Sequence, residues 1–272
     1  TSKSIFKNAD LLKNIATERV ISEFLKLICG KNTVKILDAY RETIAVIIPE
    51  ITVMFNFNQN NIHHSYDLWQ HTLTALGTIE PNPILRMTML LHDIGKPSVK
   101  TTDNSGQSHF QGHQLESKKI ADKILHRLRL PSDFINKTLL LIEYHDVRFN
   151  GSKKLMKKVM NVLGTDLTKQ LLEVEYADIS AQSEYQREEK LGYLETAKTH
   201  LNEIIKDNEC FKLSQLDING KDVLNLGVKE GRDVGNILDY LLMLVVDANV
   251  PNKKSILISK AKEYIYGNQI NK

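Results

Sequence analysis

The chain has 272 residues, of which 42% are hydrophobic, 25% charged and 7% aromatic, a composition typical of soluble globular proteins and enough for one large or two small domains. A net charge of +3 does not by itself indicate nucleic-acid binding, although a local basic face stays possible. No apolar run is long enough to cross a bilayer, and no secretory signal is present. With only two cysteines, Cys29 and Cys210, the chain fits a reducing compartment, so we expect a cytoplasmic protein that does not bind membranes. Because it starts at Thr1 without methionine, we expect a processed or excised chain.

Helical periodicity runs through almost the whole sequence. Residues 9–28 predict one long amphipathic helix closed by Gly30, and residues 31–46 predict a second helix that ends near Pro49. The β-branched and aromatic stretch 51–58 has the composition of a strand. With no partner strand in the sequence, we interpret it as an extended connector.

Further helices follow to the end of the chain. Ser132 is expected to cap the helix that follows Pro131. The predicted ranges are 66–79, 83–92, 114–129, 133–148, 153–163, 167–186, 187–206, a short helix after the turn at 218–222, 231–246 and 252–266. We therefore expect an all-α helical bundle with an N-terminal helical pair and a C-terminal helical tail. The predicted divisions are residues 1–60, 61–208 and 209–272.

Six residues of the types that bind metals are scattered over this helical pattern. They are His71, His92, Asp93, His113, His145 and Asp178. Imidazole and carboxylate ligands without a thiol suit an octahedral divalent ion better than structural zinc. The pair His92-Asp93 closes an apolar helix, where we expect Gly95 to form a left-handed cap and Pro97 to block continuation.

Such a set supports hydrolysis of a phosphoester, since a divalent ion can activate water and polarise a phosphoryl oxygen. His71, His92, Asp93 and Asp178 are predicted to hold one ion. His113 and His145 are predicted to hold a second ion or to contact the phosphate. Lys96 lies beside the His-Asp pair and is a candidate partner for the substrate's negative charge. The residues expected to take part in catalysis are Asp93, Lys96, His113 and His145.

Other residues of similar type have simpler interpretations. His63, His64, His126 and His200 are interpreted as surface or satisfied core residues, and Tyr66 and Trp69 as packing groups. His109 lies in the same segment as His113 and could line the site. The lysines at 153, 154, 157 and 158 are typical of a solvated helix face, with contact to a phosphate backbone as the alternative.

The ligand motifs resemble the HD superfamily of metal-dependent phosphohydrolases, in the form found in bacterial tRNA nucleotidyltransferases (CCA-adding enzymes) and poly(A) polymerases. The central motifs are Asp67–Leu73 (DLWQHTL), Leu90–Pro97 (LLHDIGKP), His109–His113 (HFQGH), Glu143–His145 (EYH) and Ala177–Asp178. The opening and the tail add Ala16–Ile21 (ATERVI), Ile47–Glu50 (IIPE), Ile218–Val228 (INGKDVLNLGV) and Glu230–Leu238 (EGRDVGNIL). The resemblance implies a divalent ion (Mg, Mn, Ni, Co or Fe) and a phosphoester substrate such as a nucleotide or an RNA end, 2′,3′-cyclic phosphates included.

One departure from that family bears on the chemistry. The family's nucleotide-adding head carries two carboxylates one residue apart, and no Asp-x-Asp occurs in this sequence. We therefore do not expect this chain to add nucleotides alone; it resembles the neck, HD domain and RNA-contacting tail of such an enzyme. The favoured function is phosphohydrolysis. The alternative is an RNA-binding or tRNA-binding module, with the segment 153–158 and the helix start at Gly231-Arg232 as phosphate contacts. A third interpretation is that the histidines are a structural relic without turnover.

Overall fold

A computed structural model describes residues 2–63, 66–229 and 231–269 of the protein. The chain is predominantly helical, which confirms the predicted all-α class. It divides into two compact units. Unit 1 comprises Thr1–Arg148 and Lys169–Leu194, and unit 2 comprises Phe149–Thr168 and Glu195–Lys272. No helix of the described residues is long and apolar enough to span a bilayer.

Unit 1 begins with three helical segments, two of them within residues 9–28, where one helix was predicted. They are α1 (Ser2–Asn8), η1 (Ala9–Asn14) and α2 (Thr17–Ile28). The single helix over residues 9–28 was wrong because the backbone is extended at Ile15 (φ −97°, ψ 144°). α1 and η1 bury no side chain, so packing does not hold them in line with α2, which buries Ile21, Phe24 and Ile28 on one face.

The next segment is also broken more often than its sequence predicted. The single helix over residues 31–46 was wrong: α3 (Thr33–Ala39) and α4 (Arg41–Ile47) meet at Tyr40, whose backbone leaves the helical region (φ −119°, ψ 22°). The extended connector predicted for residues 51–58 was wrong in its first half, because Pro49–Met54 forms the 3₁₀ helix η2. Pro49 presets a helical φ, and the buried Ile51 and Met54 repeat every three residues as this helix requires.

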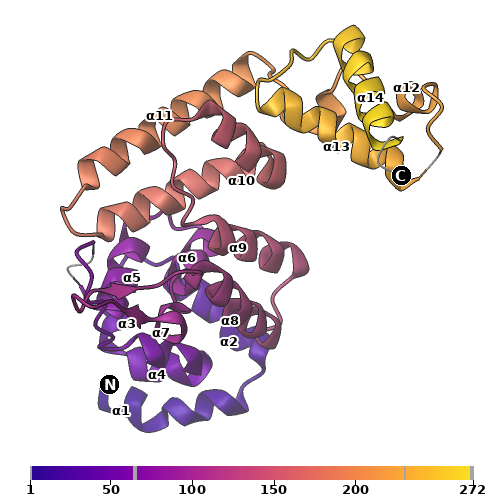
Figure 1. The fold of residues 1–272 in the computed structure, drawn as a ribbon. Coiled ribbons are helices and arrows are strands. Elements are labelled where there is room, and N and C mark those ends of the chain that lie inside the picture. The colour runs from indigo at the N-terminus through magenta and orange to yellow at the C-terminus, as the bar shows by residue number, and fades with distance from the viewer. Residues whose placement is uncertain (1, 64–65, 230, 270–272) are drawn as a thin grey trace. The chain divides into compact units, whose positions relative to one another are not determined.

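The centre of unit 1 is built from five helices and the second half of α10 (Figure 1). The five are α5 (Leu68–Thr78), α6 (Pro83–Leu91), α7 (Lys96–Val99), α8 (His113–Arg127) and α9 (Ser132–Tyr144). Every residue of α6 from Leu85 to Leu91 is buried, and α6 packs against α5 and α9 while α8 packs against α9. The predicted cap at Ser132 was wrong, since Ser132 is the first residue of α9 and no side chain caps this helix.

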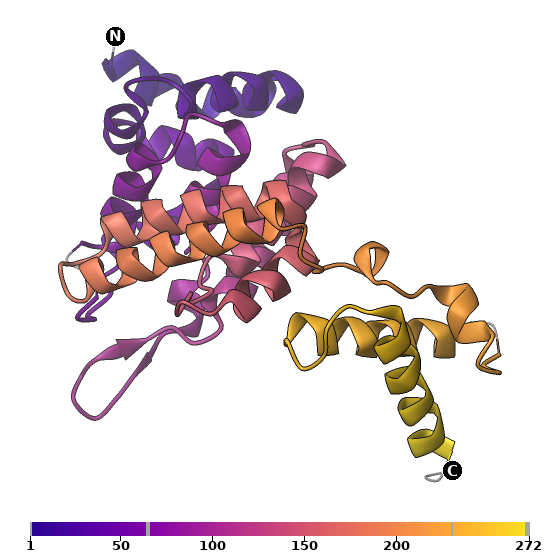
Figure 2. The same ribbon diagram turned by 90° about the horizontal axis from the view of Figure 1, so that it is seen from above.

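A short antiparallel hairpin connects α7 to α8, and Figure 2 shows it extending away from the helices. Its strands are β1 (Thr101–Thr102) and β2 (Ser108–His109). The segment before α5 fastens it: the Ser108 amide donates to the Asn60 carbonyl (2.9 Å), and the Asn61 side chain donates to the Ser108 carbonyl (2.8 Å).

Two long helices contribute residues to both units. α10 (Lys153–Ala181) contains a non-helical residue, Gly164 (φ 71°, ψ 174°), which agrees with the predicted interruption between residues 163 and 167. Glycine adopts this positive φ without the steric cost that a side chain imposes. α11 (Arg187–Lys206) has the predicted bounds.

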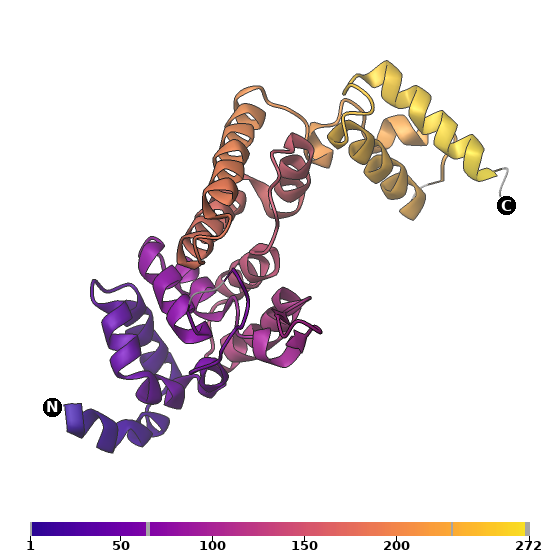
Figure 3. The same cartoon turned by 60° about the vertical axis from the view of Figure 1, so that its left-hand side comes forward.

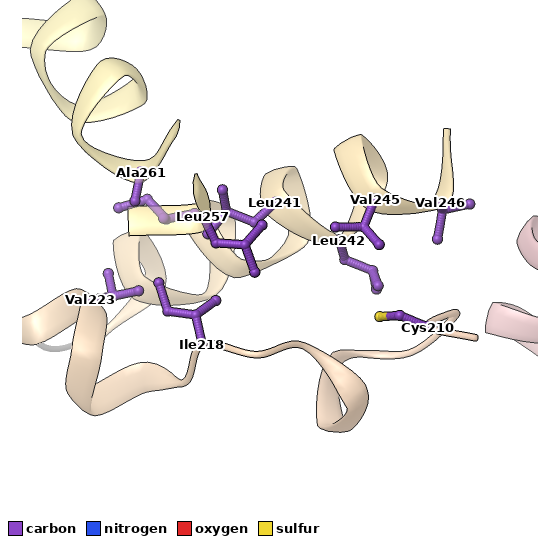
Figure 4. Close-up of a cluster of buried hydrophobic side chains, with 10 residues drawn as sticks. Cys210, Ile218, Val223, Leu241, Leu242, Val245, Val246, Leu257 and Ala261 are labelled. Carbon is purple, nitrogen blue, oxygen red and sulfur yellow. The ribbon is translucent and has the colours of Figure 1, made fainter. Parts of the chain in front are cut away.

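The remainder of unit 2 is a small helical core. It contains η3 (Leu213–Gln215), α12 (Gly220–Leu224), α13 (Arg232–Val246) and α14 (Lys254–Gln269), and α13 packs against both α12 and α14 (Figure 3). Figure 4 shows its buried cluster of Cys210, Ile218, Val223, Ile237, Leu241, Leu242, Val245, Val246, Leu257 and Ala261. The apolar residues of α13 recur at helical spacing, so one face of this helix supplies half of the cluster.

Candidate metal centre

The structure brings all six predicted ligand residues together within unit 1. His71 lies in α5, His92 and Asp93 follow α6, His113 begins α8, His145 follows α9, and Asp178 lies in the second half of α10. They form two groups that share Asp93, and within each group the ligand atoms lie within 4.8 Å of one another. The first group is His71, His92, Asp93 and Asp178; the second is Asp93, His113 and His145.

The His-Asp pair reaches this position because the chain turns immediately after α6. The left-handed cap predicted at Gly95 was wrong, since Gly95 has a helical backbone (φ −80°, ψ −15°), and Pro97 lies in the first turn of α7. The glycine is required for close approach instead. A Cβ there would lie 2.5 Å from the Ser117 amide nitrogen and 2.7 Å from the His113 carbonyl oxygen. The absent side chain therefore lets the turn that carries Asp93 lie directly against α8.

Asp93 presents its two carboxylate oxygens to different histidines. Its Oδ1 lies 3.2 Å from His113 Nε2 and 3.5 Å from His145 Nε2. Its Oδ2 lies 3.2 Å from His92 Nε2 and 3.5 Å from His71 Nε2. Asp93 thus bridges the two groups through its two oxygens.

Asp178 completes the first group from the other side. Its Oδ1 lies 2.9 Å from His71 Nε2 and 3.5 Å from His92 Nε2. Asp178 keeps 15% of its side chain exposed, whereas the side chains of His71 and Asp93 are 1% exposed. The first group is therefore open to solvent on the Asp178 side.

All four histidines are oriented in the same way by the backbone. Each Nδ1 faces a carbonyl oxygen: that of Ala181 for His71, Met89 for His92, Phe110 for His113 and Ile142 for His145. A carbonyl only accepts, so each Nδ1 carries a hydrogen and each ring presents its Nε2 to the site. The Nε2 atoms of His113 and His145 lie 3.2 Å apart, so a single cation could contact both rings.

The charges of the site depend on one another. Burial alone would lower the pKa of His92, but the carboxylates of Asp93 and Asp178 outweigh it and raise that pKa to about 10. Burial raises the pKa of Asp93, but His92 and Lys96 outweigh it, so this pKa lies well below its usual range. The pKa of Asp178 is likewise well below its usual range, because the adjacent His71 and His92 rings outweigh its burial.

A divalent cation fits this donor set. His92 Nε2 and Asp93 Oδ1 are buried and make no hydrogen bond, although they lie near other polar atoms. Buried polar atoms without hydrogen bonds are costly, and ligation of an ion is one way to satisfy several of them at once. Nitrogen and carboxylate oxygen donors without sulfur match an octahedral divalent metal.

Lys96 is buried beside Asp93 rather than exposed at the edge of the site. Its Nζ lies 2.6 Å from Asp93 Oδ2 and donates to Gln59 Oε1 at 3.1 Å. It also lies 5.6 Å from the centre of the Phe110 ring. The ammonium group thus balances the charge of Asp93 from within the protein.

The other predicted histidines lie outside the two groups. His109 is on β2, where its half-exposed ring contacts the Asp103 carboxylate at 2.8 Å. His126 contacts Asp122 on the surface of α8, and His200 contacts the Gly151 carbonyl. His63 packs against the Tyr185 ring. His64 lies outside the described residues.

The lysines predicted as a solvated face are ion-paired within unit 2. Lys153 and Lys157 both contact the carboxylate of Glu209, at 2.5 and 2.6 Å. Lys154 and Lys158 each lie 3.1 Å from Asp247 Oδ1. Each of these lysines therefore already has a carboxylate partner within the chain.

Three polar residues near the site were missed by the sequence analysis. Gln59 holds Lys96, and Gln182 donates to Asp178 Oδ2 at 2.8 Å. Glu175 is buried, with Oε1 making no hydrogen bond, and its pKa is raised well above its usual range by burial and by the nearby charges of Asp178 and Asp146. The helical spacing of Glu175 and Gln182 from Asp178 would have revealed both, because residues three and four apart share one face.

Comparison with known proteins gives two family matches. Residues 113–261, more than half of the chain, match the family described as "tRNA nucleotidyltransferase domain 2 putative". Residues 1–55 match a model described as "Probable RNA and SrmB- binding site of polymerase A".

The individual relatives are also tRNA nucleotidyltransferases or CCA proteins. A CC-adding tRNA nucleotidyltransferase of Thermus thermophilus is 29% identical over 251 residues, which cover 88% of this chain and 55% of the relative. A multifunctional CCA protein of Legionella pneumophila is 28% identical over 54% of this chain and 38% of its own length. An A-adding tRNA nucleotidyltransferase of Deinococcus radiodurans is 30% identical over 37% of this chain and 24% of its own length. The chain thus spans about half the length of the first of these relatives and less of the others. It belongs to the tRNA nucleotidyltransferase domain 2 family.

Proposed function

We propose that this chain is the tRNA-binding body of a tRNA nucleotidyltransferase. The observation that carries the proposal is the family match over residues 113–261, supported by the RNA-binding match over residues 1–55. Within this body we assign residues 1–60 to the neck, 61–208 to the HD domain and 209–272 to the tail. This was the alternative interpretation of the sequence, and the family matches favour it over phosphohydrolysis as the main function.

Exposed cations in unit 2 are the candidate contacts for the RNA backbone. Lys221 lies in α12, Lys229 in the segment between α12 and α13, and Arg232 at the first position of α13, and all three are exposed. The N-terminus of a helix of this length carries partial positive charge and free amide groups, which suit a phosphate. Lys153, Lys154, Lys157 and Lys158 are weaker candidates, because carboxylates of the same unit already pair with them.

The test is the salt dependence of tRNA binding, measured by fluorescence anisotropy. The triple variant Lys221→Ala, Lys229→Ala and Arg232→Ala is expected to bind more weakly. The slope of log affinity against log salt should also become shallower by about 0.7–0.9 for each phosphate that the variant no longer neutralises. Lys137→Ala, on α9, removes a partly exposed lysine of unit 1 and serves as the control. Binding that does not respond to salt, or that responds equally in both variants, would argue against this surface.

The second candidate function is a metal-dependent phosphohydrolase, and the cluster of four histidines and two aspartates favours it. His71, His92, Asp93 and Asp178 would hold one ion. His113 and His145, with Asp93 shared, would hold a second ion or contact the phosphate. An ion bound there would supply a Lewis acid for a phosphoryl oxygen and lower the pKa of a water molecule.

The protein's own groups have distinct tasks in this proposal. Each carboxylate oxygen of Asp93 faces one pair of histidines, so Asp93 would fix the position of the two pairs relative to each other. Lys96 holds the Asp93 carboxylate in its ionised form from the buried side. The backbone carbonyls hold the four rings with Nε2 directed inward, so no ring has to reorient when substrate arrives.

Hydrolysis and metal content are measured together to test this function. The purified chain is assayed with bis-p-nitrophenyl phosphate and 2′,3′-cyclic nucleotides after addition of Mn²⁺, Ni²⁺, Co²⁺ or Mg²⁺. Turnover that disappears in Asp93→Asn would support it. A folded protein that binds an ion and hydrolyses none of these substrates would instead favour the structural-relic interpretation.

A further inference from the structure

The last turn of α10 and the turn that follows it carry a chain of hydrogen bonds that ends on Asp178. Gln182 Nε2 donates to Asp178 Oδ2 at 2.8 Å, and Lys190 Nζ, from α11, donates to Gln182 Oε1 at 2.5 Å. All three residues belong to unit 1. The contact occupies Oδ2 of Asp178 and leaves Oδ1 facing His71 and His92.

The chemistry of the end groups fixes the direction of this chain. An ammonium group can only donate, so the oxygen of the Gln182 amide faces Lys190. An ionised carboxylate can only accept, so the nitrogen of the same amide faces Asp178. Both ends require the same orientation of the amide. The reversed amide would place its NH₂ group against the ammonium group of Lys190 and its oxygen against the carboxylate of Asp178.

The backbone of this turn is itself anchored. Arg187 donates to the carbonyls of Gln182 (3.0 Å) and Ser183 (3.2 Å), and the Ser183 amide donates to the His63 carbonyl (2.9 Å). In the same turn, the Ala181 carbonyl lies 3.2 Å from His71 Nδ1. The turn therefore orients two of the proposed ligands, His71 through its backbone and Asp178 through Gln182.

We propose that Gln182 is a positioning residue for Asp178 and that Lys190 acts through Gln182 to hold the amide in place. The inference rests on the metal centre proposed above. Asp178 needs such a restraint more than the other ligands do, because 15% of its side chain is exposed and could turn toward solvent. Partners that orient a metal ligand typically contribute about 10- to 100-fold to metal affinity.

The test measures affinity for Mn²⁺ by the electron paramagnetic resonance signal of the free ion, which does not depend on hydrolysis. Gln182→Leu is expected to weaken binding about 10- to 100-fold. Lys190→Met is expected to weaken it by up to about tenfold, and Lys190→Arg, which keeps a donor, to stay close to wild type. In the double variant, Lys190→Met should add little to Gln182→Leu, because the lysine acts through the glutamine.

Lys190→Met separates this inference from a simple charge effect. Lys190 is a cation near the site, so removing it would strengthen binding of another cation if Coulomb repulsion were its only influence. Tighter Mn²⁺ binding in Lys190→Met, or unchanged binding in Gln182→Leu, would overturn the inference. Lys198→Met, on the same helix, is the matched control and should leave the affinity unchanged.

Two further measurements separate the possible failures. Thermal unfolding in the presence of a chelator shows whether each variant is folded, and Lys190→Arg tests the position with the donor retained if Lys190→Met unfolds. Wild-type protein that binds no Mn²⁺ would refute the metal centre, and the positioning role with it. Wild-type binding that equals that of every folded variant would refute the positioning role alone.

Discussion

His71 Nε2 and Asp178 Oδ1 lie 2.9 Å apart although the two residues are 107 positions apart in the chain. The contact joins α5 to the second half of α10 and closes the first ligand group. A pair so distant in sequence meets only if the helices between them have the correct order and packing. Whether this contact forms therefore shows whether the first group of the proposed metal centre is assembled.

Asp178→Asn is expected to lower Mn²⁺ affinity by at least about 100-fold, because loss of an orienting partner alone costs about 10- to 100-fold and this change removes the ligand charge itself. The substitution keeps the shape of the side chain, so the fold should persist. Isothermal titration calorimetry measures the affinity. Asp38→Asn is the control, since Asp38 accepts a hydrogen bond from Gln70 and belongs to neither ligand group. Equal losses in the two variants would contradict a specific role for Asp178.

Metal binding should strengthen as pH rises. The pKa of His92 is raised to about 10, so the ring is protonated at neutral pH, and an ion that binds Nε2 must displace that proton. Each bound ion should then release about one proton, and the affinity should rise about tenfold per pH unit below that pKa. The pKa values of Asp93 and Asp178 are lowered, so these carboxylates are already ionised and add no such dependence above about pH 4.

Calorimetry of Mn²⁺ binding in two buffers of different ionisation enthalpy gives the number of protons released. The experiment is run at pH 6, 7 and 8 with the same ionic strength. An affinity that is constant over this range, with no proton release, would show that the ion does not displace a proton from His92.

The six candidate ligand residues could be identified from the sequence because their chemistry is unusual for their surroundings, and the structure brings them together. Asp93 ends an apolar helix, and Asp178 lies among small residues, so each required a partner. The sequence could not predict that the two carboxylate oxygens of Asp93 face different pairs of histidines. That depends on Gly95 lying against Ser117 and His113 of α8, a tertiary contact without a local signal.

Helix bounds were predicted well in α11 and poorly in the N-terminal part of the chain, where the break at Tyr40 and the break at Ile15 have no local sequence signal. α1 and η1 bury no residue, so the periodicity of residues 9–28 did not produce one helix. His109 could not be excluded from the sequence, because the hairpin that carries it away from His113 has only two residues in each strand. The division at residues 60 and 208 stays a prediction.

Gly95→Ala is expected to destabilise the protein, because the new Cβ would lie 2.5 and 2.7 Å from backbone atoms of Ser117 and His113, which cannot move away cheaply. Forcing extra atoms into a packed region costs about 1–3 kcal/mol. Urea denaturation measures the change. Gly192→Ala is a matched control in α11, where a Cβ meets nothing within 4 Å and alanine should stabilise the helix by about 0.5–1 kcal/mol. Similar effects of the two substitutions would contradict the close approach at Gly95.

Glu175→Gln is expected to stabilise the protein increasingly as pH rises. The pKa of Glu175 is raised by its burial and by Asp178 and Asp146, so the native state keeps a proton that the unfolded chain releases above its ordinary value of 4.5. The unfolded state then binds fewer protons, and the wild-type free energy of unfolding falls as pH rises from 4.5 to the raised native value. Glutamine removes this loss, which reaches at most about 1.4 kcal/mol per pH unit.

Urea denaturation in a chelating buffer at pH 4.5, 6 and 7.5 gives the difference between variant and wild type. A difference that does not change with pH would mean that Glu175 titrates normally in the native state. Glu203→Gln is the control: hydrogen bonds from Lys153 and His200 lower the pKa of Glu203, so both states are ionised above its ordinary value of 4.5 and the difference from wild type should stay constant between pH 6 and 7.5.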